Sequence, residues 1–187
     1  MKVYKLDINT NDETGMNAIA LVEFPAVEVD FLAFDKMESI KLSDEKREIT
    51  GVVCLADVPI YRYNPQLGEH YILFTKDLIK SMILKYFKMG LNNNVNIEHE
   101  GSLISGLTMI ESYIKDSSRN ISPVEFEAIP DGSWIATFKV ENDDVWNQVK
   151  NMKTLKGFSL EGLFSYGQEV EMSKEESFEE WIDDILK

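Results

Sequence analysis

Short apolar segments separated by turn residues recur along most of this chain, and they constrain its fold more than any other feature. Segments of this length that are rich in β-branched and aromatic residues are typical of β-strands. Strands at such spacing predict a β-rich α+β fold, arranged as a closed or nearly closed barrel. The expected strands cover residues 1–9, 17–24, 47–57, 71–74, 95–99, 103–115, 122–129, 133–140 and 157–167.

Two segments depart from the strand pattern and predict helices. Residues 76–89 place their apolar side chains along one helical stripe, with Thr75 as the N-cap and Gly90 at the C-terminal end. A shorter helix is expected at about 143–152. Its inner face would hold Val145, Trp146, Val149 and Met152.

The length of 187 residues suits a single domain with one core. We expect this domain to cover residues 1–167, with an irregular arm at 28–47. Residues 168–187 are expected to form an acidic linker and a short amphipathic helix that contains Trp181.

Composition limits the classes of partner. The formal net charge of −14 would repel a phosphate backbone, so nucleic acid is not an expected partner. The chain has no apolar run of about 18 residues and no apolar signal peptide, so no membrane partner is expected. Cys54 is the only cysteine, which excludes an internal disulfide and suits a reducing compartment; it is expected to be a buried, inert thiol.

A serine and a histidine at strand positions are the candidate catalytic residues. Ser159 lies in a short apolar strand flanked by Gly157 and Gly162, and His99 ends another strand. A serine hydroxyl becomes a nucleophile when an imidazole within hydrogen-bond reach takes its proton. The alternatives are a strand serine that faces solvent and a structural histidine. The second histidine, His70, follows a turn and is expected at the surface.

Two acids are candidates for the third catalytic member. Glu111 lies inside an apolar strand, where a buried carboxylate needs a partner such as an imidazolium. The alternative is that Glu111 points to water. Glu161 is the second choice, because a residue two positions from Ser159 shares its face of the strand.

Other chemistries fit less well. Two well-separated histidines and a single cysteine make a poor zinc site, and no phosphate-binding glycine loop occurs. We therefore expect neither a metal nor a cofactor.

The order of several motifs resembles the XkdF-type serine proteases of tailed bacteriophages over nearly the whole chain. The motifs with the candidate residues are Asn96-Ile97-Glu98-His99-Glu100 and Gly157-Phe158-Ser159-Leu160-Glu161-Gly162. The others lie at 17–26, 31–34, 48–53, 59–62, 110–113 and 132–134. The family is grouped with prohead proteases, which are similar to herpesvirus assemblin, a β-barrel with flanking helices.

The resemblance implies a serine endopeptidase that matures the phage head. Ser159 maps to the nucleophile and His99 to the base, with Glu111 ahead of Glu161 as the acid, because no histidine follows Ser159. The implied substrates are the scaffold and major capsid proteins inside the immature head in the host cytoplasm; the sequence does not decide whether the chain also cuts itself. A homodimer is implied by the assemblin analogy alone.

The resemblance does not assign an oxyanion hole. In assemblin this site involves an arginine-bearing loop beyond the serine, whereas no arginine follows Arg119 here. Backbone N–H groups near Ser159 are therefore expected to serve.

The alternative function is a non-catalytic capsid or scaffold module that keeps the protease fold. The net charge of −14 and the Trp181 helix motivate it, because both suit docking to a basic partner.

Overall fold

The structure is a computed structural model that describes residues 2–9, 13–22, 40–151 and 157–170. The described strands are β1 (Lys2–Asp7), β2 (Gly15–Val22), β3 (Ile40–Ser43), β4 (Glu48–Cys54), β5 (Ile60–Asn64), β6 (Gly68–Leu73), β7 (Val95–Ile97), β8 (Leu107–Ile114), β9 (Trp134–Val140), β10 (Gly157–Leu163) and β11 (Ser165–Val170). The helices are α1 (Lys76–Lys88) and α2 (Asp143–Asn151). This is the predicted β-rich α+β class.

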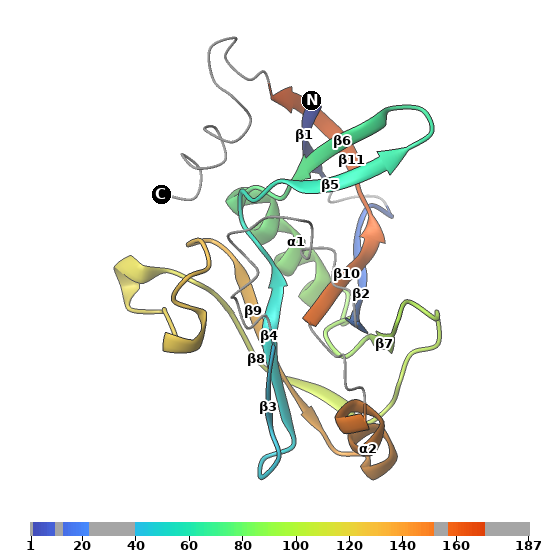
Figure 1. Cartoon of the computed structure of the whole chain (residues 1–187), viewed down its shortest axis with the longest axis vertical. Helices are drawn as coiled ribbons and strands as arrows, with labels where there is room; N and C mark the ends of the chain where they lie inside the picture. Colours follow the sequence, from blue (N-terminus) through green and yellow to red (C-terminus); the bar gives the residue numbers. More distant parts are fainter. Residues whose placement is uncertain (1, 10–12, 23–39, 152–156, 171–187) are drawn as a thin grey trace.

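The described strands form three hydrogen-bonded sheets. Their orders are β11-β1-β6-β5, β10-β2-β7 and β3-β4-β9-β8. Helix α1 lies in the middle of the molecule, where the three sheets meet (Figure 1). Within the described ranges no sheet closes into a barrel, so the barrel stays a prediction.

One core joins the three sheets to α1. Thr75 caps the helix, accepting a hydrogen bond from the Leu78 N–H at 3.2 Å, as the sequence predicts. The buried face of the helix comprises Leu78, Ile79, Met82 and Tyr86. This face packs into a cluster with apolar residues of all three sheets, including Ile72, Ile19 and Phe138. Burial of such side chains contributes roughly 1.5–3 kcal/mol each and is the main source of stability.

Several strand predictions differ from the structure. The strand expected at 122–129 is replaced by a 3₁₀ turn at Val124–Phe126, because Pro123 cannot donate to a ladder and begins the turn instead. The arm expected at 28–47 contains β3, and β5 is a further strand that was not predicted. The C-terminal helix and most of the linker lie outside the described residues.

The predicted strand at 157–167 is two strands that belong to different sheets. β10 pairs with β2, whereas β11 pairs with β1. Phe164 lies between them and packs edge-to-face on Phe74, with ring centroids 5.2 Å apart. The chain therefore passes from one sheet to another at Phe164, and the core contact with Phe74 holds this crossing.

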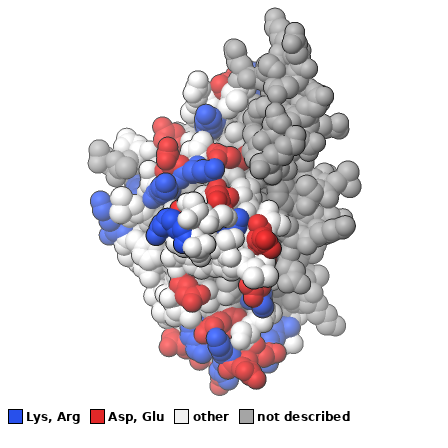
Figure 2. Space-filling model, turned by 90° about the vertical axis from the view of Figure 1, so that its left-hand side faces the viewer, with Lys and Arg blue, Asp and Glu red and all other residues white. Residues whose placement is uncertain are grey.

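Charges of both signs are interspersed over the face of the molecule in Figure 2, despite the net charge of −14. Exposed ion pairs such as Lys41–Glu125 and Lys2–Glu169 contribute little to stability in water. No helix among the described residues is long and apolar enough to cross a membrane.

Gly162 sets the approach of β10 to β2 and provides a test of this packing. A Cβ at Gly162 would lie 2.3 Å from the Gly15 carbonyl oxygen and 2.8 Å from the Met16 Cα, both of which are backbone atoms. Because backbone atoms cannot yield easily, we expect Gly162→Ala to destabilise the protein by about 2–3 kcal/mol through overpacking. Urea unfolding would measure this free energy.

Gly90→Ala is the matched control, because a Cβ at Gly90 meets nothing within 4 Å although its φ is +69°. It should cost about 1 kcal/mol, from the left-handed backbone alone. Equal effects of the two substitutions would contradict the close approach at Gly162.

Candidate active site

Ser159 is placed by the pairing of β10 with the central strand β2. It lies opposite Ala20 and is almost fully buried, at 7% exposure. On the other side of β2, Asn96 of β7 also lies opposite Ala20. Residues that pair directly point to the same face of a sheet. Ser159 and Asn96 are therefore on one face, separated by a single small side chain.

Glu161 shares this face, because it is two residues from Ser159 and the bulge in β10 comes only after it. Glu161 lies opposite Ala18, so β2 presents two alanines here. Its carboxylate Oε2 accepts a hydrogen bond from Asn96 Nδ2. The small alanines therefore let Glu161 reach across β2 to β7.

His99 follows β7 in a tight turn. Glu98 and His99 both have left-handed backbones, with φ of +52° and +57°. The Glu100 N–H closes the turn by donating to the Ile97 carbonyl at 3.0 Å. Non-glycine residues with such angles cost of order 1–3 kcal/mol each and are frequent at functional sites.

This turn brings the imidazole to Glu161. His99 Nδ1 lies 3.5 Å from Glu161 Oε2. The two side chains remain 42% and 37% exposed, so both are accessible to solvent. Asn96 and His99 therefore hold the same carboxylate oxygen, which fixes the position of Glu161 from two sides.

Ser159 and His99 are not hydrogen-bonded to each other in this structure, and among the described residues the Ser159 hydroxyl has no partner. Hydrogen bonds of catalytic groups are often long or absent without substrate. The structure thus brings Ser159, Glu161 and His99 to one face but leaves the serine unengaged.

Glu111, the first choice for the acid, lies on β8 in a different sheet. It is exposed, and its carboxylate accepts a hydrogen bond from the Thr137 hydroxyl at 2.7 Å. The structure therefore gives Glu111 the water-facing position that the sequence left as the alternative. The carboxylate that it places beside His99 is that of Glu161.

The expectation that His70 lies at the surface is wrong. His70 is fully buried, with rings of Tyr4 and Tyr166 packed edge-on against it. Its Nδ1–H donates to the Gly68 carbonyl at 2.9 Å, and Nε2 lies 2.9 Å from the Tyr166 hydroxyl. Because a carbonyl only accepts, Nδ1 carries the proton in the contact with Gly68. Both nitrogens are engaged, which makes this a structural histidine.

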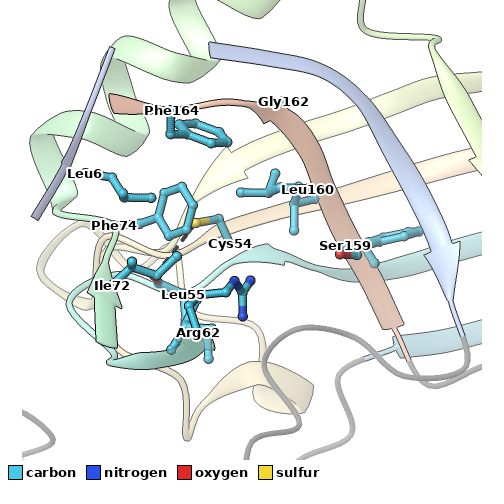
Figure 3. Close-up of a pocket in the computed structure, with 13 residues that line it drawn as sticks. Leu6, Cys54, Leu55, Arg62, Ile72, Phe74, Ser159, Leu160, Gly162 and Phe164 are labelled. Atoms are coloured by element: carbon cyan, nitrogen blue, oxygen red, sulfur yellow. Dashed lines mark hydrogen bonds between the residues drawn. The ribbon is translucent and has the colours of Figure 1, made fainter. Parts of the chain in front are cut away.

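A pocket of about 240 Å³ borders Ser159 (Figure 3). Its walls are mainly apolar, and they include Cys54, whose thiol pKa is raised by burial. The thiol is buried, as predicted, and its raised pKa disfavours the reactive thiolate. The pocket also contains the guanidinium of Arg62.

Sequence reasoning missed the hydrogen bond of Asn96 to Glu161 and the position of Arg62 in the pocket beside Ser159. In the sequence, Asn96 lies between the apolar residues Val95 and Ile97, and this polar residue inside an apolar strand was the available signal for a buried amide. The structure shows that Asn96 is buried. Its Oδ1 is buried with no hydrogen-bond partner among the described residues. Such a group costs about 1–3 kcal/mol. The opposite amide orientation would place Oδ1 against the Glu161 carboxylate, so the observed orientation is the favourable one.

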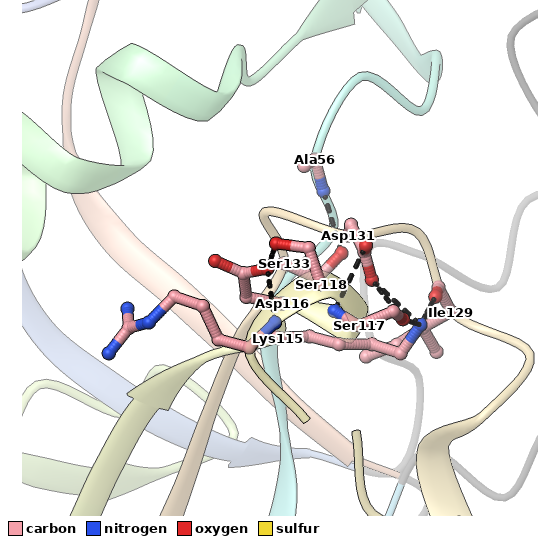
Figure 4. Close-up of polar contacts among 9 residues, drawn as sticks. Ala56, Lys115, Asp116, Ser117, Ser118, Ile129, Asp131 and Ser133 are labelled. Carbon is pink, nitrogen blue, oxygen red and sulfur yellow. Dashed lines mark hydrogen bonds and ion pairs between the residues drawn. The ribbon is translucent and has the colours of Figure 1, made fainter. Parts of the chain in front are cut away.

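A second cluster contains serines beside a buried lysine (Figure 4). Lys115 Nζ donates to the Ile129 carbonyl at 2.8 Å and contacts Asp131 Oδ1 at 3.0 Å, with Ser117 Oγ at 3.5 Å. Ser117 Oγ itself donates to Asp131 at 2.8 Å. A serine–lysine pair needs an uncharged lysine as its base. Here Lys115 and Ser117 both donate to the Asp131 carboxylate, so the serine hydroxyl and the lysine are engaged in holding the loop, and we interpret this cluster as structural.

No group of three or more histidine, cysteine or acidic side chains suited to a metal occurs in the part of the chain that the structure describes. Ser159 and Glu161 on β10, with His99 after β7, are the residue types that a serine hydrolase uses: a serine, an imidazole and a carboxylate beside that imidazole.

Comparison with known proteins agrees with this class. The model of the family described as "Putative phage serine protease XkdF" matches residues 36–166, which is more than half of the chain. The chain therefore belongs to this family of phage serine proteases. No curated protein and no solved structure matches it.

The Lys115 cluster predicts a dependence of stability on pH. Hydrogen bonds from Ser117 and Lys115 lower the pKa of Asp131 below its ordinary value. An acid with a depressed pKa stabilises the folded state above its unfolded pKa of about 3.9, and this contribution is lost as the pH falls through the folded value. We expect Asp131→Asn to be less stable than the wild type by a constant amount between about pH 7 and pH 5.

The difference in unfolding free energy should shrink below about pH 4, where the wild-type carboxylate takes up its proton. Urea unfolding of both proteins across this range would measure it. A difference that stays constant to pH 2 would contradict the ion pair.

Proposed function

We propose that this protein is a serine endopeptidase in which Ser159 is the nucleophile, His99 the general base and Glu161 the acid that orients His99. The observation that carries the proposal is the 3.5 Å contact between His99 Nδ1 and Glu161 Oε2 on the face that presents Ser159. Membership in a phage serine protease family supports the same reaction class.

The proposed reaction begins with the proton of Ser159. His99 Nε2 takes this proton while Oγ attacks the scissile carbonyl carbon, and the peptide C–N bond then breaks as the imidazolium returns the proton to the leaving amine. Water, deprotonated by His99, hydrolyses the acyl-enzyme and restores Ser159. Backbone N–H groups near Ser159 would bind the oxyanion.

Glu161 has the role of fixing the imidazole. By accepting from Nδ1–H it holds the tautomer whose Nε2 is free to act as a base, and it stabilises the imidazolium that forms. Asn96 supports this role from the other side, because its amide donates to the same carboxylate oxygen. In the proposed reactive state the ring turns about its contact with Glu161 until Nε2 reaches Ser159 Oγ.

The substrates that we propose are the scaffold and major capsid proteins of the phage, cut inside the immature head, and the chain itself. Exposure of His99 and Glu161 supports a polypeptide substrate, because an extended chain can reach them. We also propose that the three sheets correspond to an assemblin-like barrel. The core that they share around α1 supports this arrangement.

Substitution of the nucleophile or the base tests the activity. The phage capsid and scaffold proteins would be co-expressed with the wild type, Ser159→Ala or His99→Ala, and their processing followed by intact mass. We expect each variant to lower turnover by about 10⁶, because the two groups act as one unit. Ser165→Ala, at an exposed position of β11, is the control and should process normally. Normal processing by Ser159→Ala and His99→Ala would instead favour the non-catalytic capsid module.

A second pair of variants tests which acid acts on His99. Glu161→Gln should lower kcat by about 10²–10⁴, because the amide can hold the wrong histidine tautomer and provides no charge to stabilise the imidazolium. Glu111→Gln is the matched control and should retain activity, since Glu111 bonds to Thr137 on another sheet. Single-turnover cleavage of a capsid protein would measure both rates. The reverse ranking of the two variants would assign the acid to Glu111.

A further inference from the structure

Arg62 places a cation on the core-facing side of an edge strand. β5 is at the edge of its sheet, and Arg62 lies two residues from Ile60, which is buried and points inward. Arg62 pairs with the buried His70 on the neighbouring strand. Residues two apart share a face, so an apolar side chain would be the ordinary occupant of position 62. Desolvation of a guanidinium there is unfavourable unless it has a partner.

The protein supplies little to offset this burial. Arg62 Nη1 donates to the Tyr61 carbonyl at 2.8 Å. Burial lowers the pKa of the guanidinium, and the Tyr166 phenol offsets this in part. Although the chain has 33 acidic residues, none of those described forms an ion pair with Arg62. Within the described part of the chain, most of the N–H donors of the guanidinium therefore have no protein partner.

The pocket around Arg62 is shaped for a small group with an apolar stem. Figure 3 shows the guanidinium extending from the side of β5 toward the part of β10 that carries Ser159. The walls around it include Leu6, Ile72, Phe74 and Phe164, and the volume is about 240 Å³. A glutamate side chain combines two methylene groups with a carboxylate, and a guanidinium fork matches a carboxylate in a bidentate manner.

We propose that this pocket binds the carboxylate of an acidic side chain, preferably glutamate, in the polypeptide that Ser159 cleaves. The inference rests on the proposed peptidase function, because Ser159 at the border of the pocket makes it a substrate subsite. Arg62 then determines specificity and takes no part in bond cleavage. Its alternative role is structural, since inward charges on edge strands discourage pairing between sheets.

Binding is tested separately from activity, with the full chain carrying Ser159→Ala. The peptides N-acetyl-Ala-Ala-Glu-Ala-amide and its glutamine counterpart would be titrated while the arginine Nε–H signals are followed by NMR. The chain has three arginines, so comparison with the spectrum of the additional Arg62→Met variant assigns the signal. We expect the glutamate peptide to shift the Arg62 signal and to bind about tenfold more tightly or better.

Equal binding of the two peptides, or no shift from either, would overturn the proposal. A third peptide, N-acetyl-Ala-Ala-Gln with a free terminal carboxylate, distinguishes a side-chain carboxylate from a chain end. If this peptide shifts the Arg62 signal as strongly as the glutamate peptide does, the side-chain assignment is wrong.

Cleavage is tested with a peptide library whose cut sites are mapped by mass spectrometry. The wild type should favour an acidic residue at one fixed position from the cut, by about 10- to 100-fold over glutamine. Arg62→Met should lose this preference and retain cleavage at the other sites, whereas Arg62→Lys should keep part of it. Arg119→Met, at an exposed position, is the control and should cut as the wild type does.

Failure of the proposed peptidase function and failure of the Arg62 pocket assignment would give different results. Glutamate-selective binding without any Ser159-dependent cleavage would contradict the proposed peptidase function and would still support a carboxylate-binding pocket at Arg62. Ser159-dependent cleavage whose profile is unchanged in Arg62→Met would overturn the pocket assignment alone. An equal loss of rate on glutamate and glutamine peptides would also overturn it, because that result would place Arg62 at the reacting carbonyl.

Discussion

The pairing of β2 with β10 on one side and β7 on the other is the constraint on which the candidate site depends. Its register places Ser159 and Asn96 opposite the same residue, Ala20. Because β2 presents only small side chains here, Glu161 can cross it and meet the turn that carries His99. A register shift of one residue would turn the serine and the glutamate to the opposite face. The arrangement of the candidate site therefore depends on the register of the sheet that β10, β2 and β7 form.

Two buried polar groups, Lys115 and Asn96, and the half-buried Arg62 differ in how far hydrogen bonds compensate their loss of solvent. Lys115 has a carboxylate, a carbonyl and a hydroxyl around its ammonium, and it holds the loop before β9. Asn96 satisfies its donor on Glu161 and leaves its oxygen without a described partner. Arg62 has one carbonyl and no described acid. The hydrogen-bonding capacity of Lys115 is filled, whereas the two incompletely bonded groups, Asn96 and Arg62, both lie near Ser159.

Local sequence patterns predicted correctly those elements that form through interactions between residues close in sequence. The helix at α1 follows from its apolar stripe and its Thr75 cap, and both are present in the structure. The β-rich class follows from the short apolar segments. The motifs around His99 and Ser159 identified the family, which the family model confirms. The strand predicted at 122–129 does not form, because Pro123 cannot donate to a strand ladder and a 3₁₀ turn begins after it.

Composition, periodicity and motif order are contained in the chain, so they were enough to predict the β-rich α+β class, the family and the candidate residues Ser159 and His99. The tertiary structure alone decided which acid reaches His99. Glu111 and Glu161 both lie in strands, and only the pairing of those strands shows that Glu111 faces water while Glu161 meets the imidazole. The same holds for the burial of His70 and for Arg62 in the pocket. Burial and facing depend on contacts between segments distant in sequence, which a local pattern does not contain.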